Sequence, residues 1–256
     1  MPKIFVQGEV GADRKLRRDA AHALEIHDAH GDEVACALVS EGIGRPEFAS
    51  WISCETMHEL VEWAEESLPC LIKDMDFKID PKRMLAELSA RLVYLQLDYG
   101  SDNGELPLHL AFVLAYQDEF FVLQLGDAKV CHIDGMGANE IDDEPNTRRL
   151  IVHQRGLDDN GELDSCMRLK YNCHVGHYEE GDLFLLMTPE LWNRVGEKGF
   201  AKAYADHRAL SEDNLAKVTG KLIVSAGMDG GAHGLTVAGL GMTKFTAYEK
   251  LGVKVF

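Results

Sequence analysis

The pattern of hydrophobic and polar positions along the 256-residue chain alternates between strand-like runs and helical stripes. Glu33–Ser40 is a nearly continuous apolar run, which is typical of a strand buried on both faces. In chain order, the predicted strands are Lys3–Val10, Glu33–Ser40, Leu108–Tyr116, Phe120–Leu125, Lys129–Ile133, Asp182–Thr188 and Leu235–Leu240. The three strands between residues 108 and 133 follow one another closely, which favours an antiparallel meander.

Two long helical stripes separate the early strands from the later ones. The first follows Pro46, a residue that a first helical turn tolerates, and its apolar residues recur at helical spacing as far as Leu68. The second begins at Asp80 and Pro81, which suit an N-cap and a first helical position. Each helix has one apolar face, so each must cover a sheet or another helix.

Further helices are expected over about Glu197–Ala209 and from Ser211, whereas the stretch from Gly135 to Asp164 is polar and rich in turn residues. The order of strands, two helices, more strands, helices and a closing strand fits an α+β fold better than strict alternation of strand and helix. Because we find no linker and no internal repeat, we predict one domain over residues 1–256.

Composition narrows the classes of partner. With 46% hydrophobic and 27% charged residues, the chain can bury a substantial core and is not disordered. Its 26 Lys and Arg against 43 Asp and Glu give a formal net charge of −17, which opposes sequence-independent binding to nucleic acid or to an anionic membrane. The chain also has no apolar stretch near the roughly 20 residues that a membrane-spanning helix needs.

The cysteines and the N-terminus favour a cytoplasmic protein. No targeting signal is visible, and the six cysteines are scattered, so we expect reduced thiols. Phosphate-cradling loops and a nucleophile elbow are absent from the sequence, and Gly42 and Gly44 suit a tight turn better than a dinucleotide site. His22, His27 and His30 lie in a polar stretch and are most simply interpreted as solvated surface residues.

Four short segments, in order, resemble the signature blocks of the metal-dependent type 2C protein phosphatases. They are Gly11–Arg14 leading to Arg18-Asp19-Ala20, then Ala37–Gly44, Gln124–Val130 and Glu180–Trp192, with a weaker fifth match at His233–Val237. The matches span nearly the whole chain. The resemblance implies a four-layer αββα sandwich of two mainly antiparallel sheets covered by helices, with the site at one end of the two sheets.

In the enzymes of that family, two Mg²⁺ or Mn²⁺ ions activate a water for attack on phosphorus, so several carboxylates must converge. This chain departs from the pattern. Glu41 stands where the family has its metal-bridging aspartate, and Arg18 replaces the acidic residue before Asp19. Pro189 and His233 replace two further aspartates. Each of the last three substitutions removes a negative charge from the site.

Two divalent ions a few ångströms apart repel strongly unless carboxylates surround them, so the sequence predicts that no two-metal centre assembles. The leading hypothesis is therefore a degenerate family member, a pseudophosphatase that binds a protein partner or a phosphoprotein. The resemblance assigns the phosphate contact to Arg14, whose guanidinium can form a bidentate pair. Asp19 and Thr236 match the family pattern without an assigned new role.

The alternative is an active metal-dependent phosphatase with a rebuilt site. Its metal ligands would come from Glu41, Gly42, Asp127, Asp229 and His233, holding Mn²⁺ or Mg²⁺, or a single Zn²⁺ or Fe²⁺ ion. Competing interpretations remain open: Arg14 can belong to a solvated basic patch, Asp127 can serve a turn, Glu41 can cap one, and His233 can be a buried core histidine. A third hypothesis is an assembly subunit whose acidic surface meets a basic partner.

Overall fold

The computed structural model describes residues 2–9, 18–99, 106–134, 138–141, 148–157, 163–205, 220, 223–224, 226 and 235–242. Its strands are β1 (Pro2–Glu9), β2 (Asp19–His27), β3 (Glu33–Gly42), β4 (Leu108–Tyr116), β5 (Glu119–Leu125), β6 (Lys129–Ile133), β7 (Ala138–Glu140), β8 (Arg148–Leu157), β9 (Leu163–His177), β10 (Leu183–Met187) and β11 (Leu235–Met242). Its helices are α1 (Pro46–Glu66), α2 (Leu68–Asp74), α3 (Pro81–Tyr99) and α4 (Pro189–Ala205). Arg14, Asp229 and His233 lie outside the described residues.

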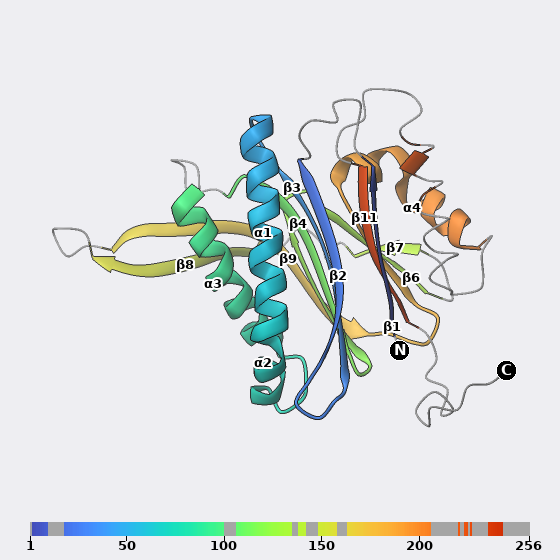
Figure 1. Ribbon diagram of the computed structural model, residues 1–256, viewed down its shortest axis with the longest axis horizontal. Helices are drawn as coiled ribbons and strands as arrows, with labels where there is room; N and C mark the ends of the chain where they lie inside the picture. Colours follow the sequence, from blue (N-terminus) through green and yellow to red (C-terminus); the bar gives the residue numbers. More distant parts are fainter. Residues whose placement is uncertain are drawn as a thin grey trace.

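Within these ranges the strands form two antiparallel sheets that face each other (Figure 1). One has the order β1-β11-β10-β6-β7 and the other the order β2-β3-β4-β5-β9-β8. Helices α1, α2 and α3 cover the outer face of the second sheet, and α4 packs on the outer face of the first. The arrangement confirms the α+β sandwich expected from the sequence.

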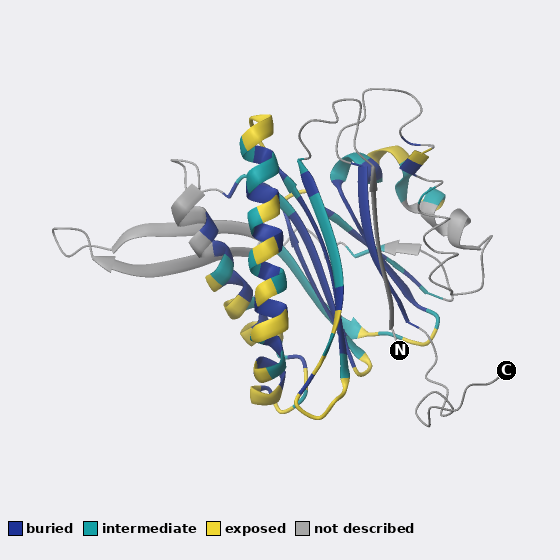
Figure 2. Cartoon of the chain, in the orientation of Figure 1, coloured by how far each residue is buried: buried dark blue, intermediate teal, exposed yellow. Residues whose placement is uncertain are grey.

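Strand β3 is apolar along most of its length because both of its faces pack against other layers. Its even-numbered residues, such as Cys36 and Leu38, pack under the helices, while its odd-numbered residues, such as Ala35 and Ala37, pack against the other sheet. Both faces are therefore buried, as the dark central strands of Figure 2 show. The layer between the sheets pairs small residues of β3 and β4 with large ones such as Phe184, which lets the two sheets approach closely.

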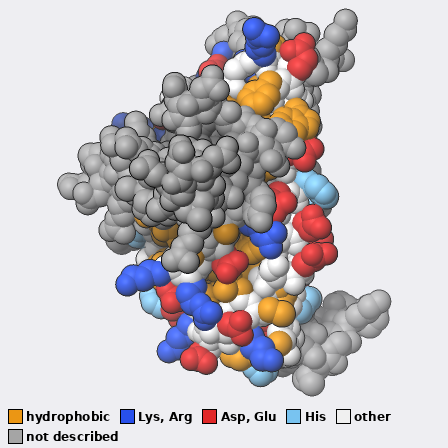
Figure 3. Space-filling view, turned by 90° about the vertical axis from the view of Figure 1, so that its left-hand side faces the viewer, with side chains coloured by type: hydrophobic (Ala, Val, Ile, Leu, Met, Phe, Trp, Pro, Cys, Tyr) orange, Lys and Arg blue, Asp and Glu red, His pale blue; other side chains and the backbone are white. Residues whose placement is uncertain are grey.

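The exposed faces of the molecule carry both signs of charge. Figure 3 shows acidic, basic and hydrophobic side chains interspersed over the side that includes the helices. None of the helices within the described ranges combines the length and the apolar character needed to cross a membrane.

Two parts of the sequence interpretation were wrong. Lys129–Ile133 does form a strand, but β6 pairs with β10 and β7 in the other sheet, so the three-stranded meander ends after β5. The stretch from Gly135 to Asp164 was interpreted as loop, yet it contains β7, β8 and the start of β9. Its loop candidates at 142–145 and 158–161 lie outside the described residues, as does the helix expected from Ser211.

Two elements were misplaced or missed for local reasons. The helix expected from Glu197 begins at Pro189, because a proline at the first position starts α4 and Gly196, with φ of 64°, interrupts its apolar stripe. Strand β2 was not predicted at all, because Asp19–His27 mixes histidines and acids with small residues and lacks a strong apolar alternation.

Filling the small-residue layer is predicted to destabilise the fold. Ala37 is fully buried between the sheets, so Ala37→Leu forces extra methylenes into a packed layer and should lower the free energy of unfolding by about 1–3 kcal/mol. Urea denaturation measures the effect. The control is Ala86→Leu at an exposed position of α3, expected to change stability by less than about 0.5 kcal/mol. Equal stability of the two variants would contradict this account of the layer.

Candidate functional site

One end of the space between the sheets carries a row of polar side chains. Asp19 on β2 lies opposite Glu41 on β3, and Glu41 lies opposite His109 on β4. Directly opposed residues of adjacent strands share a face of the sheet. For all three residues that face is the one toward the other sheet, because the neighbouring odd-numbered residues of β3 and β4 pack there. The row therefore stands where the inter-sheet core ends.

Asp19 and Thr236, the two residues that match the family pattern, are in contact. The Thr236 hydroxyl donates a hydrogen bond to the Asp19 carboxylate, and Asp19 is only 4% exposed. Thr236 is also tied to Thr188, whose Oγ1 accepts from the Thr236 backbone N–H at 3.2 Å. Since β2 and β11 belong to different sheets, this polar contact joins the two sheets at the site.

Glu41 is the electrostatic centre of the row. Burial and, to a smaller extent, the negative charges of Asp19 and Glu190 raise the pKa of its carboxyl to about 7, against the opposing charge of Arg18. These charges act at short range, so the carboxyls of β2, β3 and α4 and the guanidinium of Arg18 form one charge cluster. Arg18 thus supplies a fixed cation where the family has an acidic residue.

Glu190 is the site residue that the sequence analysis missed. It lies in the first turn of α4, directly after Pro189, and its carboxylate accepts a hydrogen bond from Arg194 Nε at 2.6 Å. Arg194 in turn donates to the Ala226 carbonyl at 2.7 Å, which fixes the pair. A signal for it is present in the fourth sequence block, where Glu190 follows Pro189 directly and stands where the family pattern has a glycine.

Asp127 lies at the corner where the chain leaves one sheet for the other. Its side chain is exposed, and its backbone N–H donates to Nδ1 of His109 at 3.0 Å. Gly126 has φ of 63°, and a Cβ there would stand 2.3 Å from His109 Nδ1, so glycine is required. Burial lowers the pKa of His109, which suits a neutral ring that accepts a hydrogen bond.

Gly42 lets helix α1 pack against the end of β3. A Cβ at this position would lie 2.0 Å from the backbone oxygen of Ala49, and the Gly42 N–H donates to the Arg18 carbonyl at 2.7 Å. The next residue, Ile43, exposes 42% of its surface at the rim of the site. The chain therefore presents an apolar side chain immediately beside the charge cluster.

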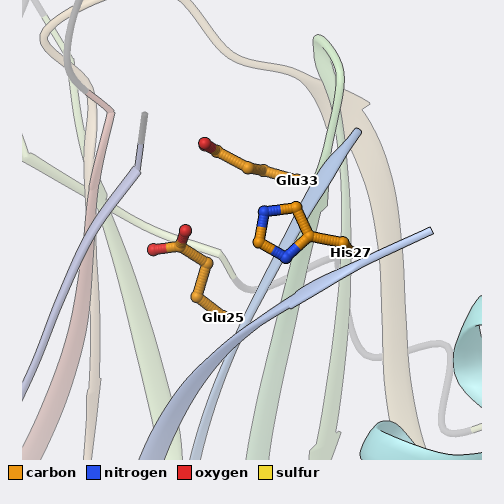
Figure 4. A group of neighbouring side chains, drawn as sticks. All are labelled: Glu25, His27 and Glu33. Carbon is orange, nitrogen blue, oxygen red and sulfur yellow. The ribbon is translucent and has the colours of Figure 1, made fainter. Parts of the chain in front are cut away.

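The described residues around Glu41 do not form a compact group of metal ligands. Among the described residues, the one group of three His, Cys, Asp or Glu side chains with ligand atoms within 4.8 Å of one another is Glu25, His27 and Glu33, far from Glu41 (Figure 4). Asp19 is engaged by a hydroxyl, and Asp127 is exposed at its turn. Of the sequence-derived metal candidates, Glu41, Gly42 and Asp127 lie in the described part of the chain.

No family model and no curated protein matches this sequence. Solved structures do match it. A serine/threonine phosphatase of S. agalactiae aligns over 95% of this chain and 100% of its own, with 14% identity and a TM-score of 0.62. The Mycobacterium tuberculosis phosphatase PstP/Ppp aligns over 95% and 99%, with 15% identity and a TM-score of 0.64. PppA of Pseudomonas aeruginosa aligns over 95% and 98%, with 18% identity and a TM-score of 0.60.

These alignments cover each phosphatase nearly from end to end, and the two antiparallel sheets with their covering helices correspond to that architecture. At such low identity the likeness concerns the backbone. The chain therefore has the fold of the type 2C serine/threonine phosphatases.

Proposed function

We propose that this protein is a pseudophosphatase of the type 2C fold, which acts by binding a protein partner. The observation that carries the proposal is the charge of Arg18 acting on Glu41 in the carboxylate cluster. A fixed guanidinium offsets part of the negative charge that divalent ions would otherwise neutralise, and it repels such ions. A fold can outlast its first activity when the site residues change.

The neighbouring structures support a regulatory role. PppA is described as a key regulatory component of T6SS in Pseudomonas aeruginosa. The catalytic domain of PstP, by contrast, was solved in complex with two manganese ions. We infer that this chain retained the fold as a scaffold for recognition and lost the ability to bind two metal ions. A cytoplasmic location stays a prediction from the sequence.

The proposed partner is a phosphoprotein that docks at this end of the sandwich. Arg14 supplies the phosphate contact, as the family resemblance implies, because a guanidinium fork matches two phosphate oxygens. Exposed Ile43 supplies an apolar contact at the rim. Together they would bind a phosphorylated side chain and the hydrophobic residue beside it.

A second candidate function is an active metal-dependent phosphatase with a rebuilt site. The observation that favours it is Glu190, which brings a carboxylate near Glu41 that the family pattern does not require. Asp127, Asp229 and His233 would complete such a site around a single ion of Mn²⁺, Zn²⁺ or Fe²⁺. The proposal and this candidate differ in one measurable property, which is turnover.

Wild-type protein should not hydrolyse p-nitrophenyl phosphate with Mn²⁺ or Mg²⁺, because Arg18 and the lost carboxylates prevent a two-ion centre. The variant Arg18→Glu/Pro189→Asp/His233→Asp restores three negative charges and should gain Mn²⁺ binding by isothermal titration calorimetry. The control is Arg83→Glu, an equivalent charge reversal at an exposed position of α3. Turnover by the wild type that disappears in Glu41→Ala would establish the second candidate instead.

Replacing Glu41 is predicted to stabilise the protein at alkaline pH. The folded-state pKa of about 7 exceeds the ordinary value of 4.5, so the native state binds the proton more tightly than the unfolded state. This contribution is present below pH 4.5 and is lost as pH rises through 7. Relative to wild type, Glu41→Gln should gain on the order of 1–2 kcal/mol between pH 5 and pH 8, allowing for solvent screening.

Urea denaturation without divalent ions at a series of pH values measures this difference. The control is Glu65→Gln at an exposed position of α1, which removes the same charge far from the cluster. A pH-independent difference between Glu41→Gln and wild type would show that the fold does not raise the pKa of Glu41.

A pool of phosphoserine peptides should bind more tightly than its unphosphorylated counterpart. Arg14→Ala is expected to remove this preference, with a loss of about tenfold in affinity for the phosphorylated pool. Fluorescence anisotropy measures both pools. Lys82→Ala, a charge removal at an exposed position of α3, is the matched control. Equal affinities of wild type for the two pools would refute phosphate recognition.

A further inference from the structure

Three potential metal ligands meet at the end of β2 and β3 that lies opposite the candidate site (Figure 4). Glu25 and His27 belong to β2 and Glu33 belongs to β3. Glu33 and Glu41 stand near the two ends of β3, which at about 3.3 Å per residue places them roughly 26 Å apart. The cluster is therefore separate from the charge cluster around Glu41.

The strand pairing brings the three side chains to one face. His27 lies directly opposite Glu33 in the antiparallel ladder, and Glu25 is two residues before His27, so all three project from the same side of the sheet. One ligand atom of each lies within 4.8 Å of the other two. Tetrahedral ligands at about 2.0–2.2 Å from a shared ion stand about 3.3–3.6 Å from one another, so the three side chains have to move closer together to bind one.

The backbone that carries the cluster is held firmly. In the turn between the strands, the buried Asp28 carboxylate accepts the backbone N–H groups of His30 and Asp32, each at 2.8 Å. Its other oxygen accepts the hydroxyl of Tyr116 on β4 at 2.6 Å. The hairpin end is thus anchored to the next strand, so closure of the ligands on an ion would require movement of the side chains and not of the backbone.

The ligand atoms are also available. Among the described residues, none forms a hydrogen bond or a salt bridge with the side chain of Glu25, His27 or Glu33. Glu25 and His27 are exposed, so an ion and its water ligands can reach them. The two carboxylates converge beside one imidazole, and a cation would relieve their mutual repulsion.

We propose that Glu25, His27 and Glu33 bind one divalent transition-metal ion, with Zn²⁺ as the preferred ion and water completing the coordination. Imidazole and carboxylate are the ligands of zinc sites that keep an open position. The bound ion would link β2 to β3 at the edge of the six-stranded sheet. This inference is independent of the proposed function, because none of the three residues belongs to the candidate site.

The test titrates the full-length protein, first treated with a chelator, with Zn²⁺ alone. Calorimetry should detect one ion per chain, and the melting temperature should rise with the Zn²⁺ concentration because the ion binds the folded state. His27→Ala and Glu33→Gln should each weaken binding by at least about tenfold. His22→Ala, on the same strand outside the cluster, and Glu65→Gln, at an exposed position of α1, should leave it unchanged.

Co²⁺ substitution identifies the ligands. Visible absorption without a thiolate charge-transfer band is expected from nitrogen and oxygen donors, and the visible bands should be lost in His27→Ala. Equal Zn²⁺ affinity in wild type and His27→Ala, or a thiolate band, would overturn the proposal. Metal-free melting curves show whether each variant is folded, so a folding defect is distinguished from a lost site.

Discussion

The two sheets of this protein can face each other closely because one of them offers small side chains to the other. Ala37 of β3 and Ala111 and Ala115 of β4 leave room for large residues such as Phe184 of the opposite sheet. Close approach brings the ends of strands from both sheets together, so that Thr236 reaches Asp19. The geometry of the candidate site is therefore a consequence of how the inter-sheet layer is packed.

The balance of charge at that site bears on the proposed loss of the two ions. A phosphatase of this architecture has to assemble several carboxylates, whose repulsion the ions compensate. In this chain the charge of Arg18 acts on Glu41, and Arg194 forms an ion pair with Glu190. The cluster therefore includes cations of its own beside the carboxylates. The destabilisation that remains comes from the buried Glu41 carboxyl, as its raised pKa indicates.

The sequence predicted well where local periodicity determines structure. Strands β3, β4 and β5 and helices α1 and α3 carry continuous or periodic apolar patterns, and their positions follow from them. The change of sheet at Asp127 was not predictable in this way, because pairing between β6 and β10 joins residues distant in the chain. Strand β2 was also missed, because its neighbouring strands hold it in the sheet and its own sequence pattern does not indicate a strand.

The same distinction applies to the functional residues. Glu41 was identified because the family resemblance places it where the metal-bridging aspartate stands, whereas Glu190 acquires its role from the fold, which carries α4 to the end of β3. His27 was interpreted as a solvated histidine because it lies in a polar stretch, and it is exposed, but its pairing with Glu33 is seen only in the fold. Charged residues from neighbouring strands come together at both ends of β3, and such groups can be identified only in the structure. An ion at the Glu33 end, roughly 26 Å from Glu41, is too distant to activate a water there, so it would influence the stability of the hairpin and not chemistry at Glu41.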